Sequence, residues 1–250
     1  MALNFHAYAN PARFMMLSRR LVAPIAMIAG VLIALGVYLA LWGSPPDYQQ
    51  GDTVRIMYIH VPAAWLSLLC YTVMALASAT ALVFRHPLAD VCAKSAAPIG
   101  ASFTFLALVT GSLWGKPMWG TWWVWDARLT SVLILFFLYL GYLALWATIE
   151  EPVRAARAAA VLALVGFVNV PIIHYSVVWW NTLHQPASVF RIGGPTIAPS
   201  MLAPLLIMAT GFTVMFVALL LLRMRAEILR RRVRSLRLAQ AGFAGGGREA

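Results

Sequence analysis

Charged residues are scarce in this sequence of 250 residues. They make up 11% of the chain, whereas a soluble domain usually carries about 25%. Acidic residues are scarcer still, with 8 Asp and Glu against 19 Lys and Arg. Since 62% of the residues are hydrophobic, the chain has too little polar surface to fold as a water-soluble domain. The rules that apply to it are those of the lipid bilayer.

The sequence also lacks several features that carry chemistry in other proteins. Its two cysteines, Cys70 and Cys92, show no CxxC or disulfide spacing, and we assign them no role. It contains no internal repeat and no Walker-type phosphate loop. The missing phosphate loop disfavours ATP-driven transport by this chain alone.

Six apolar stretches are long enough to cross a hydrocarbon core of about 30 Å, which takes roughly 20 helical residues. They cover residues 21–41, 56–84, 97–114, 129–149, 158–178 and 201–222. The sequence therefore predicts an all-α integral membrane protein with one six-helix membrane domain over residues 1–222. The first stretch has no convincing small-residue cleavage site, so we expect it to be retained as a helix.

A basic, Gly-rich tail over residues 223–250 follows the last apolar stretch. It holds 8 of the 19 basic residues. This position indicates a cytoplasmic anchor facing anionic membrane lipids, and we expect no nucleic-acid partner. Residues 223–238 either continue the last helix as a basic surface helix or form a solvated charge run, and we favour the second. We expect Gly242–Gly247 to end any regular structure.

The distribution of basic residues indicates the orientation of the chain. With both termini in the cytoplasm, 15 basic residues lie inside and four lie outside, namely Arg55, Lys116, Arg128 and Arg191. The asymmetry follows the positive-inside rule. The outer loops, residues 42–55, 115–128 and 179–200, concentrate Trp, Gly, Pro and His. Any binding chemistry should therefore face outward.

The densest sequence feature is the segment WGKPMWGTWWVWDAR, residues 114–128, with five tryptophans in twelve residues. Single tryptophans near the end of a span are ordinary interface anchors, but a cluster of this density is unusual. If residues 118–127 form a helix opened by Pro117, one of its faces presents Trp119, Trp122, Trp123 and Asp126. This face would be an aromatic shelf for a large planar apolar ligand. Asp126 would then orient Arg128 or an indole N–H.

Two of the five histidines, His60 and His184, are placed at the outer edge. His60 lies about one turn into the second span, where an ionisable group is costly and usually functional. His184 lies just beyond the outer end of the fifth span. His174 lies deeper in that span; we favour a packed or hydrogen-bonded helix histidine there, and it remains a rival ligand. We assign no role to His6 and His86.

These residue types match the parts of haem. Its iron takes axial histidines, its macrocycle packs on aromatic rings, and its propionates need cations, for which Arg55 and Arg128 are the nearest outward candidates. Two alternatives stay open, a permease that moves haem or another amphiphile through its own bundle and a b-type electron-transfer subunit. The scarcity of mid-span charge disfavours the first. The position of both histidines near one edge disfavours the second.

The segment WGKPMWGTWWVWDARLTS, residues 114–131, strongly resembles the tryptophan-rich WWD signature of the haem-handling proteins of cytochrome c maturation. The segments MYIHVPAAW, residues 57–65, and VPIIHYSVVWWNTLHQP, residues 170–186, are similar to the flanking histidine segments of the haem exporter protein C family within this group. The resemblance covers residues 56–186, and the six-helix layout agrees with it. The first ten residues and the tail carry no motif of the family.

The resemblance implies a multi-pass protein of the bacterial inner membrane that binds haem b at the periplasmic face. Such a protein delivers haem to a periplasmic haem chaperone for c-type cytochrome biogenesis and is not an enzyme. The implied partners include ABC transporter subunits of the maturation system and a small membrane subunit. His60 and His184 would be the axial ligands, and Arg55 and Arg128 the propionate partners. The platform for haem and chaperone would comprise Trp114, Trp119, Trp122, Trp123, Trp125 and Asp126.

Overall fold

The structure, a computed structural model, describes residues 10–246; His6 and the last four residues of the tail lie outside this range. Within it, six helical segments are long and apolar enough to cross a membrane, which confirms the all-helical membrane fold. Their elements are α2 (Pro11–Tyr38) with the π-helix η1 (Leu39–Gly43), the 3-10 helix η2 (Asp52–Ile56) with α3 (Met57–Phe84), α4 (Ala89–Trp119), α5 (Ala127–Thr148), α6 (Pro152–Gly166) with α7 (Asn169–Trp179), and α8 (Pro199–Gly246).

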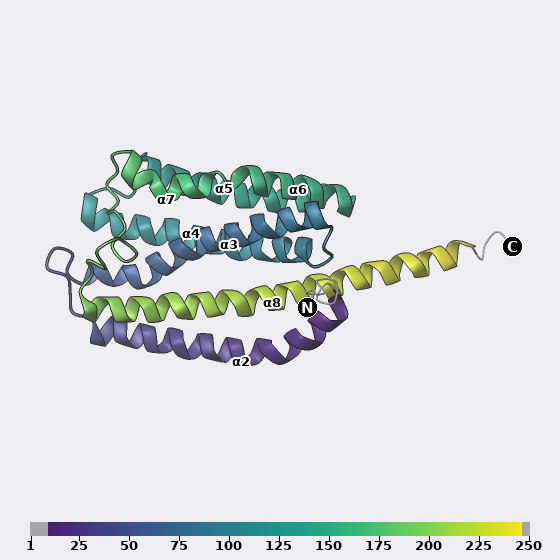
Figure 1. The fold of residues 1–250 in the computed structure, drawn as a ribbon, viewed down its shortest axis with the longest axis horizontal. Helices are drawn as coiled ribbons and strands as arrows, with labels where there is room; N and C mark the ends of the chain where they lie inside the picture. The colour runs from purple at the N-terminus through teal and green to yellow at the C-terminus, as the bar shows by residue number, and fades with distance from the viewer. Residues whose placement is uncertain (1–9, 247–250) are drawn as a thin grey trace.

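The helices lie side by side in an elongated bundle (Figure 1). Three connecting segments, residues 44–51, 120–126 and 180–198, gather at one end of this bundle, which we call the loop end. The short connectors 85–88 and 149–151 lie at the other end, together with the start of α2. We call this the tail end. The three segments predicted to face outward thus share one face of the molecule.

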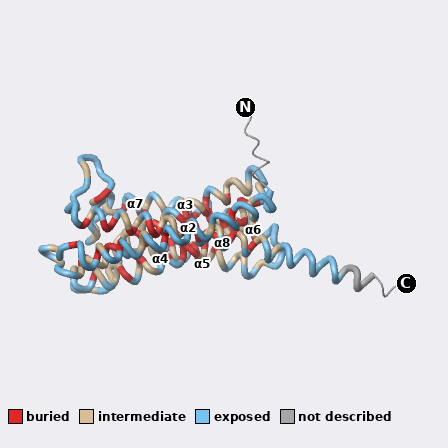
Figure 2. Tube along the Cα trace, turned by 90° about the horizontal axis from the view of Figure 1, so that it is seen from below, coloured by how far each residue is buried: buried red, intermediate tan, exposed pale blue. Residues whose placement is uncertain are grey.

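The core lies where α3 and α4 pack along each other and against α8, with α2 beyond α8 and α5 to α7 on the opposite side (Figures 1 and 2). Buried tyrosines contribute much of its volume, and each needs a partner for its hydroxyl. Tyr139 of α5 donates to the carbonyl of Ser67 on α3 at 2.8 Å. A Cβ at Gly100 would overlap the Tyr139 hydroxyl, so glycine permits this close approach.

The fifth span is not a regular helix. It is broken after Gly166, and α7 begins at Asn169, whose side-chain amide donates to the carbonyl of Ser131 on α5 at 2.8 Å. Ile173 and Ser176 form the buried side of α7, which leaves His174 on the exposed side, edge-on to Tyr175. His174 therefore packs only against this neighbouring ring and makes no hydrogen bond within residues 10–246, so the expected packing is limited to one aromatic contact.

The tail is helical over most of its length. α8 continues without interruption from the bundle to Gly246 (Figure 1), so the described helix extends into the Gly242–Gly247 stretch that is expected to end it. The solvated charge run that we favoured is wrong for its first turns, since Met224 and Glu227 are buried. Residues 232–241 are exposed, as Figure 2 shows for the part that projects from the bundle.

An ion-pair network explains why the first turns of the tail pack on the bundle. Glu227 accepts from Lys94 of α4 at 2.8 Å and from Arg231 at 3.0 Å. Arg231 also donates to Asp90 of α4 at 2.7 Å. A buried carboxylate needs such partners to offset its lost hydration. Asp90 and Lys94 lie more than a hundred residues before the tail, so no local pattern in the sequence signals this contact.

Candidate functional site

His60 lies in the first turn of α3 at the loop end, as the sequence predicts. Its Nδ1 is 3.1 Å from Oγ1 of Thr110 on α4. The Thr110 hydroxyl has a single proton, which it donates to the carbonyl of Leu106 at 2.6 Å. Thr110 therefore accepts the Nδ1–H of His60. This contact fixes the tautomer of His60 and leaves a lone pair on its Nε2.

His184 lies in the connecting segment between α7 and α8, next to His60. The two ring centroids are 6.5 Å apart, and the ring planes differ by 38°. His184 donates from Nδ1 to the carbonyl of Gln185 at 2.9 Å, so its Nε2 also carries a lone pair. Within residues 10–246, the side-chain hydrogen bonds of both rings use Nδ1, and the backbone of Ala107 on α4 also lies close to the His60 ring. The fold thus brings together two imidazoles from distant parts of the chain, each with a lone pair on its Nε2.

Arg128 is the cation that acts on this histidine pair. Burial lowers the pKa of His184, and the positive charge of Arg128 lowers it further, against the opposing effects of the Gln185 carbonyl and Asp126. The lowered pKa favours the neutral imidazole, which is the form that binds metals. Arg128 is half-buried in the first turn of α5 and donates to the carbonyl of Ile173 on α7.

Arg55, the second cation predicted for the site, has structural contacts. It donates from Nη1 to the carbonyls of Ala40 and Leu41 at the π-helical end of the first span. Its Nε pairs with Asp52 at 3.0 Å. These contacts tie the end of the first span to the start of the second. The two arginines therefore differ in role, because Arg55 holds helix ends together whereas Arg128 lies beside the histidine pair.

The predicted helix over residues 118–127 is wrong. α4 ends at Trp119, followed by Gly120 with φ of 75°, and the Gly120 N–H donates to the carbonyl of Lys116 at 3.0 Å. Asp126 caps α5, since its Oδ1 accepts the N–H of Leu129 at 2.7 Å. Because residues 120–126 are not helical, the tryptophans do not share one helix face. Gly120 and Asp126 are ordinary stop and start signals, which the shelf prediction overlooked.

Asp126 does not orient Arg128 or an indole by a hydrogen bond, contrary to the prediction. Its Oδ2 is buried without a hydrogen-bond partner among the described residues. The Nε1 of Trp123 is likewise a buried donor with no acceptor in this part of the chain. Trp123 lies edge-on to Trp125, with ring centroids 5.5 Å apart. The segment therefore leaves one donor and one acceptor unsatisfied.

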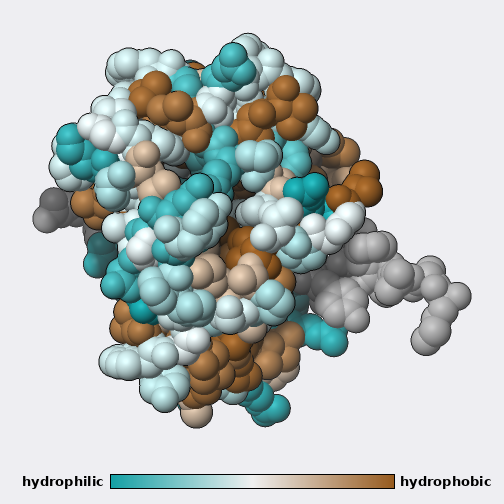
Figure 3. Space-filling model, turned by 90° about the vertical axis from the view of Figure 1, so that its left-hand side faces the viewer, coloured by the Kyte–Doolittle hydropathy of each residue, from teal (hydrophilic) through white to brown (hydrophobic). Residues whose placement is uncertain are grey.

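The tryptophans of the segment occupy distinct environments. Trp114 lies edge-on to His60 at 5.7 Å between ring centroids, and its Nε1 donates to Oε1 of Gln50 at 2.9 Å. Trp119 lies half-buried in the last turn of α4. Trp122 and Trp125 are 54% and 75% exposed. Figure 3, which views the loop end, shows hydrophobic side chains in patches among polar ones.

Sequence reasoning missed three residues that shape this site, Gln50, Thr110 and Gly111. Gly111 provides room for His60, since a Cβ at this position would lie 3.0 Å from Cε1 of the imidazole. Thr110 and Gly111 interrupt an apolar run in α4, which is the only signal that the sequence offers. No spacing rule connects them to His60, fifty positions earlier in the chain.

A family model described as "Heme exporter protein C" matches residues 4–239. The chain belongs to this family. The match extends over most of the first ten residues and most of the tail, beyond the segments in which the sequence alone shows a family motif. Membership places the protein among those of haem export and cytochrome c maturation, and the six spans make it a multi-pass membrane protein.

Individual members of the heme exporter protein C family are similar over nearly the whole chain. "Heme exporter protein C" of Bradyrhizobium diazoefficiens is 63% identical over 233 residues, 93% of this chain and 88% of that protein. The protein of the same name from Escherichia coli K12 is 48% identical over 224 residues, 90% of each chain. A "Putative cytochrome c biosynthesis ccmC-like mitochondrial protein" of Marchantia polymorpha is 49% identical over 203 residues, 81% of this chain and 86% of that one.

Proposed function

We propose that this protein binds haem b at its loop end, with His60 and His184 as the two axial ligands, and hands it to a periplasmic haem chaperone. It acts beside ABC transporter subunits of the cytochrome c maturation system and a small membrane subunit. The protein makes and breaks no covalent bond of a substrate. The observation that carries this proposal is the pairing of two imidazoles that are anchored through Nδ1 within residues 10–246 and so can present Nε2 to a metal.

The spacing of the two rings supports a single shared haem iron. Two histidine nitrogens bound to one metal from opposite sides lie about 4 Å apart, and each ring centre lies about 1 Å further out, which gives roughly 6 Å in all. The ring centroids of His60 and His184 are 6.5 Å apart. Histidines that bind metals usually donate their other N–H to the protein. Thr110 and the Gln185 carbonyl accept these N–H groups here.

Polar groups at the loop end suit the propionates. Arg128 supplies a positive charge beside His184, and guanidinium groups pair well with carboxylates. The unsatisfied Nε1 of Trp123 is a further donor for a carboxylate. Arg55 uses its Nη1 and Nε for contacts within the protein, which leaves Nη2 for a second propionate. Trp114, edge-on to His60, provides an apolar wall.

The surface of the loop end suits contact with another protein. Several large apolar side chains are exposed there: Tyr48 90%, Trp122 54%, Trp125 75%, Phe190 74% and Ile192 101%. Apolar side chains grouped outside a membrane domain indicate an interaction surface. His60 lies on a helix, whereas His184 lies in the connecting segment 180–198, which also holds Phe190. A shift of this segment would release one face of the haem without unfolding the bundle.

The proposed orientation places the loop end in the periplasm. The four basic residues Arg55, Lys116, Arg128 and Arg191 are the ones predicted outside, and the remaining 15 belong to segments at the tail end or to the tail. The positive-inside rule then assigns the tail end to the cytoplasm of a bacterial inner membrane.

The optical spectrum of the purified protein tests the ligand assignment. The wild type should show the low-spin bands of a bis-histidine haem, and His60→Ala or His184→Ala should convert them to five-coordinate bands and impair transfer to purified chaperone. His174→Ala is the matched control, since that ring lies on the exposed side of α7. Loss of the low-spin bands in the His174 variant, with retention in the His184 variant, would refute the assignment. Haem that stays on the wild type in the presence of chaperone would favour an electron-transfer subunit.

A further inference from the structure

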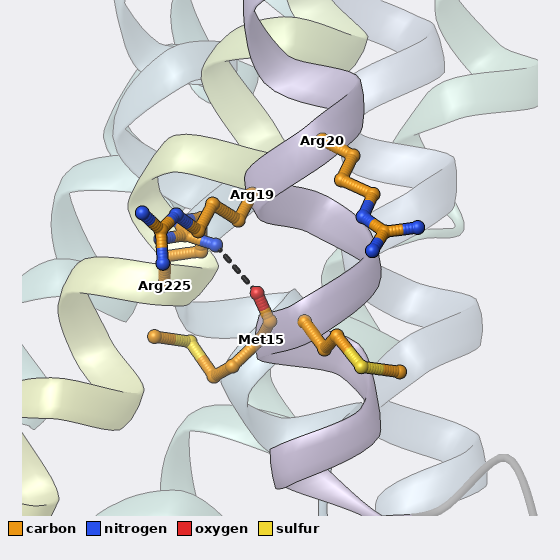
Figure 4. A pocket seen from close by; sticks show the side chains of 5 residues that line it. Met15, Arg19, Arg20 and Arg225 are labelled. Carbon is orange, nitrogen blue, oxygen red and sulfur yellow. Dashed lines mark hydrogen bonds between the residues drawn. The ribbon is translucent and has the colours of Figure 1, made fainter.

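A basic hollow lies at the tail end, between α2 and α8, remote from the histidine pair. Its lining residues are Met15, Met16, Arg19, Arg20 and Arg225. Figure 4 shows Arg19 extending from α2 toward Arg225 of α8, whereas Arg20 extends to the other side of α2. Two helices from opposite ends of the sequence thus direct two guanidinium groups into one hollow.

One edge of the Arg225 guanidinium is bound within the protein. Its Nη1 donates to the carbonyl of Met15 at 2.7 Å and to Oγ of Ser18 at 3.0 Å. The hydroxyl of Ser18 in turn donates to the carbonyl of Phe14 at 2.7 Å. The other three N–H groups of Arg225 have no partner among residues 10–246. Arg225 is therefore held in place with most of its donors available.

Among the described residues, no carboxylate pairs with the cations of this hollow. Within residues 10–246, no salt bridge involves Arg19, Arg20 or Arg225. The next turns of α8 differ, because Arg231 there is paired with Glu227 and Asp90. Guanidinium groups that converge without a counter-ion repel each other, and an external anion removes this repulsion. The hollow is thus built to receive negative charge.

The position of the hollow along the helices narrows the choice of anion. Arg19 and Arg20 directly precede the apolar run that begins at Leu21, and Arg225 follows the apolar run that ends at Leu222. All three therefore lie at the level of the lipid headgroups. Met15 and Met16 give the hollow an apolar side. A phosphate joined to acyl chains meets both requirements, whereas a free phosphate uses only the cations.

We propose that this hollow binds the phosphate of an anionic phospholipid, with Arg19 and Arg225 as the principal contacts and Arg20 at the flank. Basic pockets between helices at a membrane surface are a known mode of lipid recognition. The lipid would join α2 to α8, which is the main packing partner of α2 in the described structure. A basic tail attracts anionic lipids non-specifically along its whole length. This site instead is local and depends on two arginines, Arg19 and Arg225.

Lipid binding to the purified, delipidated full chain tests the proposal. Native mass spectrometry should detect retained phosphatidylglycerol or cardiolipin and no comparable retention of phosphatidylcholine. Arg19→Gln should weaken anionic-lipid binding about fivefold, the order expected for one arginine near a membrane surface. Arg19 is exposed and makes no contact that the fold requires, so this variant should insert normally. Arg225→Lys keeps the charge and should retain more binding than Arg225→Gln.

Arg234→Gln combined with Arg237→Gln is the matched control, since both residues lie on the exposed part of α8 beyond the hollow. This double variant should bind anionic lipid as the wild type does. An equal loss in the control would overturn the proposal in favour of diffuse attraction to the tail. Inorganic phosphate that competes fully at millimolar concentration would instead identify a free-phosphate site. Haem spectra should be the same in all these variants, so the result is independent of the proposed function.

Discussion

Thr110 of α4 accepts the Nδ1–H of His60 of α3 across 3.1 Å, and its own hydroxyl proton is donated to Leu106. The direction of both hydrogen bonds follows from the single hydroxyl proton of threonine. Thr110 thereby sets the tautomer of an imidazole fifty positions away and leaves its Nε2 free to bind iron. We regard Thr110 as a positioning residue for the proposed haem ligand.

Replacing Thr110 by Val keeps the shape of the side chain but removes the acceptor. Mutating a residue that hydrogen-bonds to a metal-bound histidine typically lowers metal affinity by about 10- to 100-fold. We expect a loss of haem affinity on the order of this size in the Val variant. Titration of haem into the purified variant, followed by its low-spin bands, measures the effect. Thr110→Ser retains the hydroxyl and should restore most of the affinity. Equal affinities for the wild type and the Val variant would remove Thr110 from the site.

Gly111→Ala should weaken haem binding through His60 alone. The new Cβ would lie 3.0 Å from Cε1 of His60, so the imidazole has to shift by a few tenths of an ångström. Gly30→Ala is the control, because its Cβ would meet nothing within 4 Å. Both changes favour helix formation to a similar extent. Thermal unfolding should therefore show no loss of stability in Gly30→Ala. Haem titration should show weaker binding in Gly111→Ala and wild-type binding in Gly30→Ala. Normal haem affinity in Gly111→Ala would contradict the prediction, because it would show that the imidazole of His60 can move without losing the haem.

Haem binding should persist at mildly acidic pH. Burial and Arg128 lower the pKa of His184 from its ordinary value, about 6.5. Because iron binds the neutral imidazole, protons compete only when the pH falls to this lowered pKa. Arg128→Gln should move the midpoint of haem loss to higher pH, as measured by spectra over a pH series. Arg191→Gln removes an outer charge elsewhere and should leave the midpoint unchanged; the same shift in both variants would contradict a local effect of Arg128.

The exposed tryptophans should contribute to chaperone contact more than to haem retention. Trp122→Ala combined with Trp125→Ala removes two of the largest exposed rings at the loop end. Aromatic anchors at interfaces commonly cost more than about 1 kcal/mol each when truncated, so chaperone affinity should fall roughly tenfold or more. Co-purification with the chaperone measures this effect, and the low-spin spectrum serves as the internal control. Trp114→Ala should have the reverse pattern, since Trp114 lies against His60.

Reporter fusions test the orientation on which the proposed function depends. Alkaline phosphatase fused after Asp47, Trp122 or Gly193 should be active, because these residues lie in the three segments of the loop end. A fusion after His86, in the connector between α3 and α4, should be inactive. The reverse pattern would place the histidine pair in the cytoplasm and exclude delivery to a periplasmic chaperone.

The sequence by itself determined the membrane fold and the family. Apolar runs of about 20 residues have one stable solution in a bilayer, since helices alone satisfy their own backbone there. The position of His60, one turn from the edge of its span, follows from the same hydropathy. Gly120 and Asp126 are also local sequence signals, because they mark the end of α4 and the start of α5. Local signals suffice for these features because their physical causes are local.

Only the tertiary structure decided which groups meet. His60 and His184 are separated by 124 positions along the chain, and their proximity depends on how α3 packs beside the segment that follows α7. Thr110 reaches His60 because α3 and α4 pack along each other. His174 lies on the exposed side of α7, which begins after a break in the fifth span. Partners of this kind are chosen by packing between helices, where small residues and few polar contacts decide the register, and no periodicity in the sequence records that choice.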